Sequence, residues 1–157
     1  MTNDDSARRL ERLVDEAEIA EVVHAYCYHF DRAEADEVLA LFAPDATVDY
    51  GPEVPTLRGT DEIGAMVAAG LKDFFAATSH HVSNFMIRFD GPDAARSMCY
   101  LYAWHRYRDG RPESELWGQY HHEFRRLSGR WKISALVLRA AGSRDFHRAE
   151  MHPIGRR

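Results

Sequence analysis

Met98–Tyr107 reads MCYLYAWHRY, a run in which bulky aromatic side chains alternate with smaller ones. Successive side chains of a β-strand point to opposite faces, so this alternation predicts a strand with two different faces. The smaller face carries Cys99, Leu101, Ala103, His105 and Tyr107, and the bulkier face carries Met98, Tyr100, Tyr102, Trp104 and Arg106. We expect helices to pack on the smaller face and leave a pocket there. A second copy of the chain should cover the aromatic face, because so large an apolar surface is rarely left in water.

The second half of the chain contains four β-rich runs: Val82–Phe89, Ala95–Arg108, Glu115–Leu127 and Trp131–Leu138. Short segments rich in Gly, Pro, Asp and Ser separate them, which is typical of turns between neighbouring strands. Consecutive strands joined in this way form an antiparallel meander. The long central strands should twist and curl around whatever packs against them.

The first half is mostly helical in pattern. Apolar residues recur at helical spacing from Ala7 to Phe30, and a second short helix is expected at Ala35–Phe42. A short strand follows at Thr47–Tyr50, and a third helix opens at Thr60 or Asp61, either of which is a suitable cap. Helices followed by a strand meander predict an α+β fold, with N-terminal helices packed over a curved antiparallel sheet and enclosing one pocket.

Length and composition exclude several classes of protein. At 157 residues the chain has the size of one domain, 1–157, and its net charge of −5 argues against a nucleic-acid partner. No run is long and apolar enough for a membrane span, and the polar N-terminus lacks the apolar region of a signal peptide, so we expect a cytoplasmic protein. Cys27 and Cys99 are expected to be small buried residues.

Several ionisable residues lie where the pattern expects apolar ones. His105 is on the inward face of its strand, and His80 and His81 directly precede the first long strand, so at most one of the two should enter the pocket. Asp31 ends the first helix, but with Glu34 it could equally form a capping box for the second helix. An inward histidine such as His105 or His122 is more often a core residue than a catalyst. No histidine spacing typical of zinc sites is present, so we expect no metal and no cofactor.

The order of segments resembles the SnoaL-like proteins of the NTF2-like, or cystatin-like α+β-cone, superfamily. The resemblance covers roughly residues 10 to 140 and rests on six stretches: Ala17–Val23, His29–Asp36, Leu41–Ala46, Thr78–Asn84, Ala103–Tyr107 and Gly129–Ile133. It is specific for the fold and weak for the reaction, because this fold carries many chemistries.

Within the superfamily the chain is most similar to the scytalone dehydratase-like branch. That resemblance implies a catalytic pair of Asp31 and His80, with Tyr50 and His105 as further catalytic residues. His80 is preferred over His81 because Asn84 then takes the place of an asparagine found in the family. Phe30 and Tyr120 differ from the branch, which leaves the substrate open. The expected substrate-binding residues are Tyr28, Phe30, Asn84, Leu101, Tyr107, Tyr120, His122 and Phe124.

The resemblance therefore implies a lyase that performs a dehydratase-type elimination on a small hydrophobic, cyclic or aromatic substrate by acid–base catalysis. The alternatives are an isomerase or polyketide cyclase of the same fold, and a non-catalytic binding protein or an oxygenase small subunit. We expect neither nucleic acid nor membrane as a partner, and a homo-oligomer, dimer or trimer, formed through the convex sheet face. The segment Gly142–Ile154 is either a lid over the pocket or a flexible tail.

Overall fold

A computed structural model describes residues 3–155. Met1, Thr2, Arg156 and Arg157, which belong to the expected domain 1–157, lie outside the described residues. The helical elements are α1 (Asn3–Asp31), α2 (Ala35–Ala40), α3 (Gly59–Ala69) and a π-helical turn η1 (Gly70–Phe74). The strands are β1 (Phe42–Asp49), β2 (Leu57–Arg58), β3 (Phe75–Phe89), β4 (Ala94–Tyr107), β5 (Ser114–Leu127) and β6 (Arg130–Arg144).

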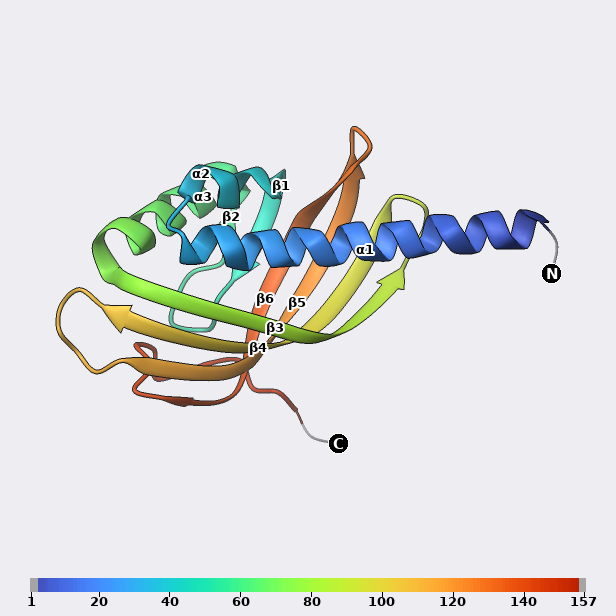
Figure 1. Cartoon of the computed structure of the whole chain (residues 1–157). Coiled ribbons are helices and arrows are strands. Elements are labelled where there is room, and N and C mark those ends of the chain that lie inside the picture. Colours follow the sequence, from blue (N-terminus) through green and yellow to red (C-terminus); the bar gives the residue numbers. More distant parts are fainter. Residues whose placement is uncertain (1–2, 156–157) are drawn as a thin grey trace.

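One six-stranded sheet runs in the order β2-β1-β6-β5-β4-β3. β3 to β6 form the expected antiparallel meander, and the sheet curves beneath the helices without closing (Figure 1). β1 pairs with β6 in parallel, with Val48 opposite Leu136, so the sheet is mixed rather than purely antiparallel. The α+β fold expected from the sequence is confirmed, and this one parallel pairing is the correction to it.

The alternation along β4 is confirmed residue by residue. The smaller face is buried from Cys99 to Tyr107, whereas the bulkier face is half-buried or exposed. On that outer side of the sheet Met86, Tyr100 and Trp117 are 57%, 48% and 40% exposed. Oligomerisation through this face stays a prediction.

β3 begins at Phe75, seven residues before the expected start at Val82, so His80 and His81 lie inside the strand. A β-bulge interrupts its pairing with β4 between Ser83 and Met86, and Asn84 there has a φ of 55°. A bulge inserts one extra residue and changes which side chains face inward. The inward positions are therefore even-numbered from Thr78 to Val82 and odd-numbered from Phe85 to Phe89. A second irregularity, between Phe75 and Ala77, lets Phe75 face inward as well.

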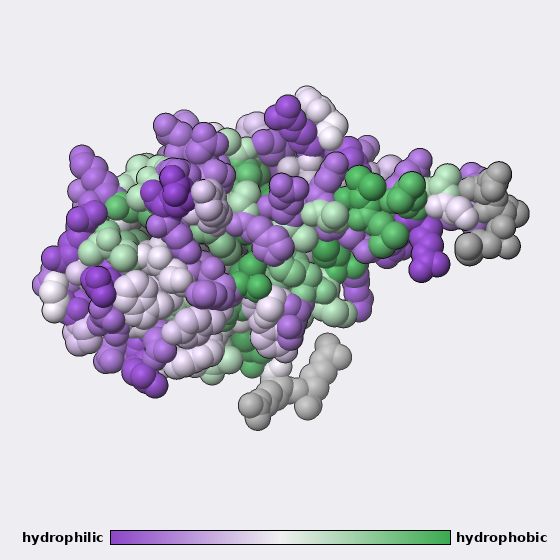
Figure 2. Space-filling view, viewed as in Figure 1, coloured by the Kyte–Doolittle hydropathy of each residue, from purple (hydrophilic) through white to green (hydrophobic). Residues whose placement is uncertain are grey.

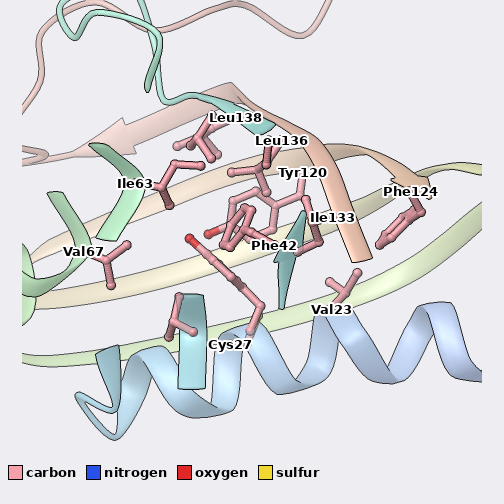
Figure 3. Packing of buried hydrophobic residues seen from close by; sticks show 14 of the residues in the cluster. Val23, Cys27, Phe42, Ile63, Val67, Tyr120, Phe124, Ile133, Leu136 and Leu138 are labelled. Carbon is pink, nitrogen blue, oxygen red and sulfur yellow. The ribbon is translucent and has the colours of Figure 1, made fainter. Parts of the chain in front are cut away.

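The helices cover the concave face of the sheet and complete the core. Figure 3 shows Val23 of α1, with Ile63 and Val67 of α3, around the buried side chain of Tyr120 on β5. Cys27 is also in this core, and both cysteines are buried as free thiols, as expected. No helix within residues 3–155 is both long enough and apolar enough to cross a membrane.

The N-terminal part of α1 projects past the sheet (Figure 1). Figure 2 shows apolar residues on this projection, where Leu10, Leu13 and Val14 are at least 49% exposed. Leu10 and Val14 line a surface pocket with Phe89 and Pro92, where β3 ends and the turn to β4 begins.

Two helix boundaries differ from the expected ones. α2 ends at Ala40 because Phe42 already belongs to β1. α3 begins at Gly59, and neither Thr60 nor Asp61 caps it. Instead the Arg58 N–H at the start of this helix donates to Glu62 Oε2 at 2.8 Å.

Candidate active site

A cavity of about 520 Å³ lies between the concave face of the sheet and the helices α1, α3 and η1. Volumes of this size are typical of small-molecule sites. Most of its wall is apolar, with Phe30, Phe75, Leu101, Leu116, Leu138 and Phe146 among the lining residues. Polar side chains reach the cavity from four parts of the fold. These are the C-terminal end of α1, the neighbouring strands β3 and β4, the end of β1, and the segment after β6.

His80 and Asp31 form a hydrogen-bonded pair at one wall of this cavity. His80 Nδ1 lies 2.6 Å from Asp31 Oδ1, and the backbone N–H of His80 donates to Asp31 Oδ2 at 2.8 Å. The Thr78 hydroxyl donates to Asp31 Oδ1 at 2.7 Å. Three donors thus hold the carboxylate in place. The side chain of His80 is only 5% exposed, and no other described residue bonds to its Nε2.

The electrostatics of the pair favour an ionised Asp31. Burial opposes ionisation of the carboxyl group, but the hydrogen bonds and positive charge of His80, with the Thr78 hydrogen bond, outweigh burial and lower the pKa of Asp31. An ionised carboxylate at Nδ1 places the histidine proton on that nitrogen. Nε2 then carries the lone pair that faces the cavity.

The end of α1 brings Asp31 to this position. Ala33, with a φ of 58°, turns the chain out of the helix, and Glu34 stands at the N-cap position of α2 without a side-chain cap. The Glu34 carboxylate instead contacts His29 and Arg32. Asp31 is therefore not part of a capping box, which settles the alternative left open by the sequence.

Two phenols form a second polar group at the end of β1. The hydroxyls of Tyr26 and Tyr50 are 2.8 Å apart. Burial raises the pKa of Tyr50 despite the hydrogen bond to Tyr26 and the charge of Arg148, and burial raises the pKa of Tyr26 still further. Both phenols are therefore neutral near pH 7, and one of them has a proton to donate into the cavity.

A third polar group joins β4, β5 and the segment after β6. The Tyr107 hydroxyl lies 2.6 Å from Ser114 Oγ and 2.9 Å from His147 Nδ1, and Ser114 Oγ lies 3.4 Å from His105 Nδ1. Burial and then the neighbouring His80 and His147 lower the pKa of His105 to about 3. Burial and then Arg148 and Arg111 lower the pKa of His147 to about 4. Both imidazoles are thus neutral near pH 7.

The segment after β6 closes the cavity on the side of Tyr50. Phe146, His147 and Arg148 line it, and Arg148 Nη1 donates to the Tyr50 carbonyl at 2.9 Å. The backbone N–H groups of the next two residues donate to Glu53. The first residues of the expected lid or tail belong to β6, which runs to Arg144 rather than ending at Leu138.

All four expected catalytic residues lie in or at this cavity. His80, His105 and Tyr50 line it, and Asp31 contacts it through His80. Of the expected substrate-binding residues, Phe30, Leu101 and Tyr120 line it as well.

The other five expected substrate-binding residues do not line the cavity. Tyr28 is 57% exposed, because the buried stripe of α1 passes through Tyr26, Cys27 and Phe30 instead. Asn84 is exposed at the bulge of β3.

Tyr107, His122 and Phe124 face inward as expected but are covered by other side chains. Tyr107 lies behind the wall and holds His147 and Ser114. His122 and Phe124 lie further along β5 in the core, 2% and 1% exposed. Strand parity correctly gave the face of these residues but could not give their distance from the cavity.

Four polar residues that line the cavity were not among the expected site residues: Tyr26, Asp73, His147 and Arg148. The sequence does contain a signal for Tyr26, because this residue precedes Phe30 by four positions and therefore lies on the same inward face of α1. Arg148 has no such signal apart from its position after Phe146 and His147, because an arginine in a polar segment is normally exposed to solvent. Within residues 3–155, no cluster of three or more His, Cys, Asp or Glu is arranged to hold a metal ion.

Comparisons with known proteins agree with this fold. A candidate scytalone dehydratase from Novosphingobium aromaticivorans DSM 12444 is 34% identical, with 94% of this chain and 97% of that one covered and a TM-score of 0.88. Hexachlorocyclohexane dehydrochlorinase LinA-type3 from Novosphingobium barchaimii LL02 is 19% identical over 94% and 99% of the chains, with a TM-score of 0.78. A candidate aromatic ring hydroxylase from Novosphingobium aromaticivorans DSM is 24% identical over 80% and 88%, with a TM-score of 0.75.

Comparison with curated proteins gave no match. The model of the SnoaL-like domain matches residues 11–137, which include most of α1, the whole of β3 to β5 and about half of β6. This match spans most of the chain and both members of the Asp31–His80 pair. The chain therefore belongs to the SnoaL-like domain family.

Proposed function

We propose that the chain is a cofactor-independent lyase, in which His80 is the general base and Asp31 orients it, and which eliminates a small leaving group such as water from an apolar cyclic or aromatic substrate. The observation that carries this proposal is the 2.6 Å contact between His80 Nδ1 and Asp31 Oδ1, made by a histidine that lines an apolar cavity. The likeness to a candidate scytalone dehydratase at 34% identity supports a lyase.

The pair is suited to removing a proton from carbon. Asp31 keeps the Nδ1 proton in place and stabilises the imidazolium that forms when Nε2 accepts a second proton. In the elimination the C–H bond breaks, its electron pair becomes the new C=C bond, and the proton goes to Nε2. The neighbouring C–O bond breaks, and the hydroxyl leaves as water after it receives a proton.

The other polar side chains of the cavity have separate roles in the proposed reaction. A neutral His105 is a poor proton donor, so its role is to hydrogen-bond a substrate oxygen. The phenol pair Tyr26–Tyr50, directly or through water, supplies the proton or hydrogen bond to the leaving hydroxyl or to an activating carbonyl. General acid–base help of this kind is worth on the order of 10²–10⁴-fold in rate.

The test is a screen of hydroxylated cyclic ketones for dehydration, followed by variants on any substrate found. His80→Ala and Asp31→Asn should each lower kcat/KM by about 10²–10⁴-fold. His81→Gln is the matched control, because His81 neighbours His80 but is exposed and outside the cavity. Circular dichroism checks that each variant is folded.

Two results would contradict the proposal. If folded His80→Ala retained the wild-type rate, His80 would not be the base. If the product had the same mass as the substrate, the reaction would be an isomerisation or cyclisation rather than an elimination.

A further inference from the structure

The cavity contains a positive charge that the proposed elimination does not use. Arg148 lines the wall next to Tyr50, and burial lowers the pKa of its guanidinium. Arginine nevertheless stays protonated in proteins. A cation in an otherwise apolar cavity is costly unless an anion or hydrogen-bond acceptors compensate it.

The protein compensates this charge only in part. One N–H of Arg148 donates to the Tyr50 carbonyl, and the guanidinium lies 5.5 Å from the centre of the Tyr50 ring. A guanidinium has five N–H donors, and among the described residues no further acceptor bonds to Arg148 and no carboxylate pairs with it. At least four donors are thus left for a ligand or for water.

The charge of Glu53 favours the protonated form of Arg148, but no described carboxylate forms an ion pair with it. Glu53 accepts hydrogen bonds from the backbone N–H groups of Ala149 and Glu150, through the same carboxylate oxygen. Asp73, at the rim, is exposed and makes no ion pair with Arg148. Asp31 is held by His80 at another wall.

We propose that Arg148 binds a negatively charged oxygen of the ligand, so that the cavity selects apolar ring compounds that bear a carboxylate, phenolate or enolate group. The planar fork of an arginine fits such oxygens, and a pair of charge-assisted hydrogen bonds fixes the orientation of the ring. Tyr50 stands beside Arg148 and can donate a further hydrogen bond to the same oxygen.

This inference deepens the proposed function and rests on it only in taking the cavity as the substrate site. An anionic oxygen at Arg148 would direct the ring of the ligand along the apolar wall toward His80. If the bound oxygen belongs to an enolate that forms during the reaction, Arg148 stabilises it as its charge develops.

The test compares two probes of similar shape that differ in charge, 2-naphthoate and 2-acetylnaphthalene, by calorimetric titration at neutral pH. The wild-type protein should bind the naphthoate more tightly by about 10- to 100-fold, the value of hydrogen bonds between charged groups. Arg148→Met should lose this preference and still bind the neutral ketone, which shows that its cavity is intact. Arg148→Lys should retain part of the preference.

Arg144→Met is the matched control, because Arg144 is an exposed arginine of β6 that pairs with Glu115 and does not line the cavity. It should keep the wild-type preference. Equal affinity of the wild-type protein for both probes, or an unchanged preference in Arg148→Met, would overturn the inference. His80→Ala should keep the preference, so that failure of the proposed base and failure of the anion site give different results.

Discussion

His122 on β5 should make the stability of the protein depend on pH. Its side chain is 2% exposed, its Nδ1 lies 3.3 Å from Ser97 Oγ, and its Nε2 has no hydrogen-bond partner among the described residues. Burial, with a smaller contribution from His121, lowers the pKa of His122 from 6.5 to about 3. The folded protein thus holds this imidazole neutral in a place where a charge would be unpaired.

The size of the effect follows from the two pKa values. In the unfolded chain the imidazole takes up its proton near pH 6.5, whereas in the folded chain it does so only near pH 3. Acid therefore stabilises the unfolded chain, and the contribution of His122 to stability is lost as the pH falls from about 6.5 toward 3. Between about pH 7 and pH 4.5 the loss amounts to roughly 2–3 kcal/mol for this one residue.

The assay is urea unfolding of the wild-type protein and of His122→Leu at both pH values. Leucine has a similar volume and no titratable group, so the variant should lose roughly 2–3 kcal/mol less stability on acidification than the wild type. Phe124→Leu is the control, because this neighbouring core residue is equally buried but does not titrate. It should lower stability by the same amount at both pH values.

The outcome that refutes this reasoning is an equal loss of stability on acidification in the wild type and in His122→Leu. That result would mean that His122 is hydrated or paired in solution. The other histidines whose pKa values are lowered, His105, His121 and His147, are present in both proteins and cancel in the comparison.

Two further predictions concern packing and thiol reactivity. Gly118→Ala should destabilise the fold by about 1–3 kcal/mol in urea unfolding, because an added Cβ would lie 2.5 Å from the Arg139 carbonyl oxygen. Gly142→Ala is the control and should lower the free energy of unfolding less, because an added Cβ there would have no atom within 4 Å. Equal losses in the two variants would contradict the close approach at Gly118. Burial raises the pKa of Cys99 to about 12 and also raises that of Cys27. Iodoacetamide at about pH 8 should therefore alkylate neither thiol in the native protein and both in denaturant; rapid native alkylation would show that the core opens.

The faces of the central strands could be predicted from the sequence because alternation is a local property. Cys99 to Tyr107 are buried on every second residue as expected. The start of β3 could not be predicted in this way, since Ala76 to Ser79 are small or polar and show no strand pattern. The parallel pairing of β1 with β6 also has no local signal, because it joins segments about 90 residues apart.

The same distinction between local patterns and long-range contacts applies to the residues of the candidate site. The positions of Asp31, His80, Tyr50 and His105 followed from the order of motifs in the family. The expected role of Asn84 also rested on that resemblance, but Asn84 lies exposed at a bulge of β3. Arg148 reaches the cavity only because the segment after β6 folds back onto the end of β1, and such a contact cannot be read from neighbouring residues.

The way this segment is attached has a consequence for how the cavity is entered. Phe146 to Arg148 are held by side-chain contacts, among them the hydrogen bonds of His147 to Tyr107 and of Arg148 to Tyr50, whereas β3 to β6 are joined by ladders of backbone hydrogen bonds. Segments outside such ladders can open locally at a free energy below that of global unfolding. We expect local opening of this wall to speed the exchange of a ligand with solvent. An anion that bridges Arg148 would slow amide hydrogen exchange there while leaving the exchange of the sheet unchanged.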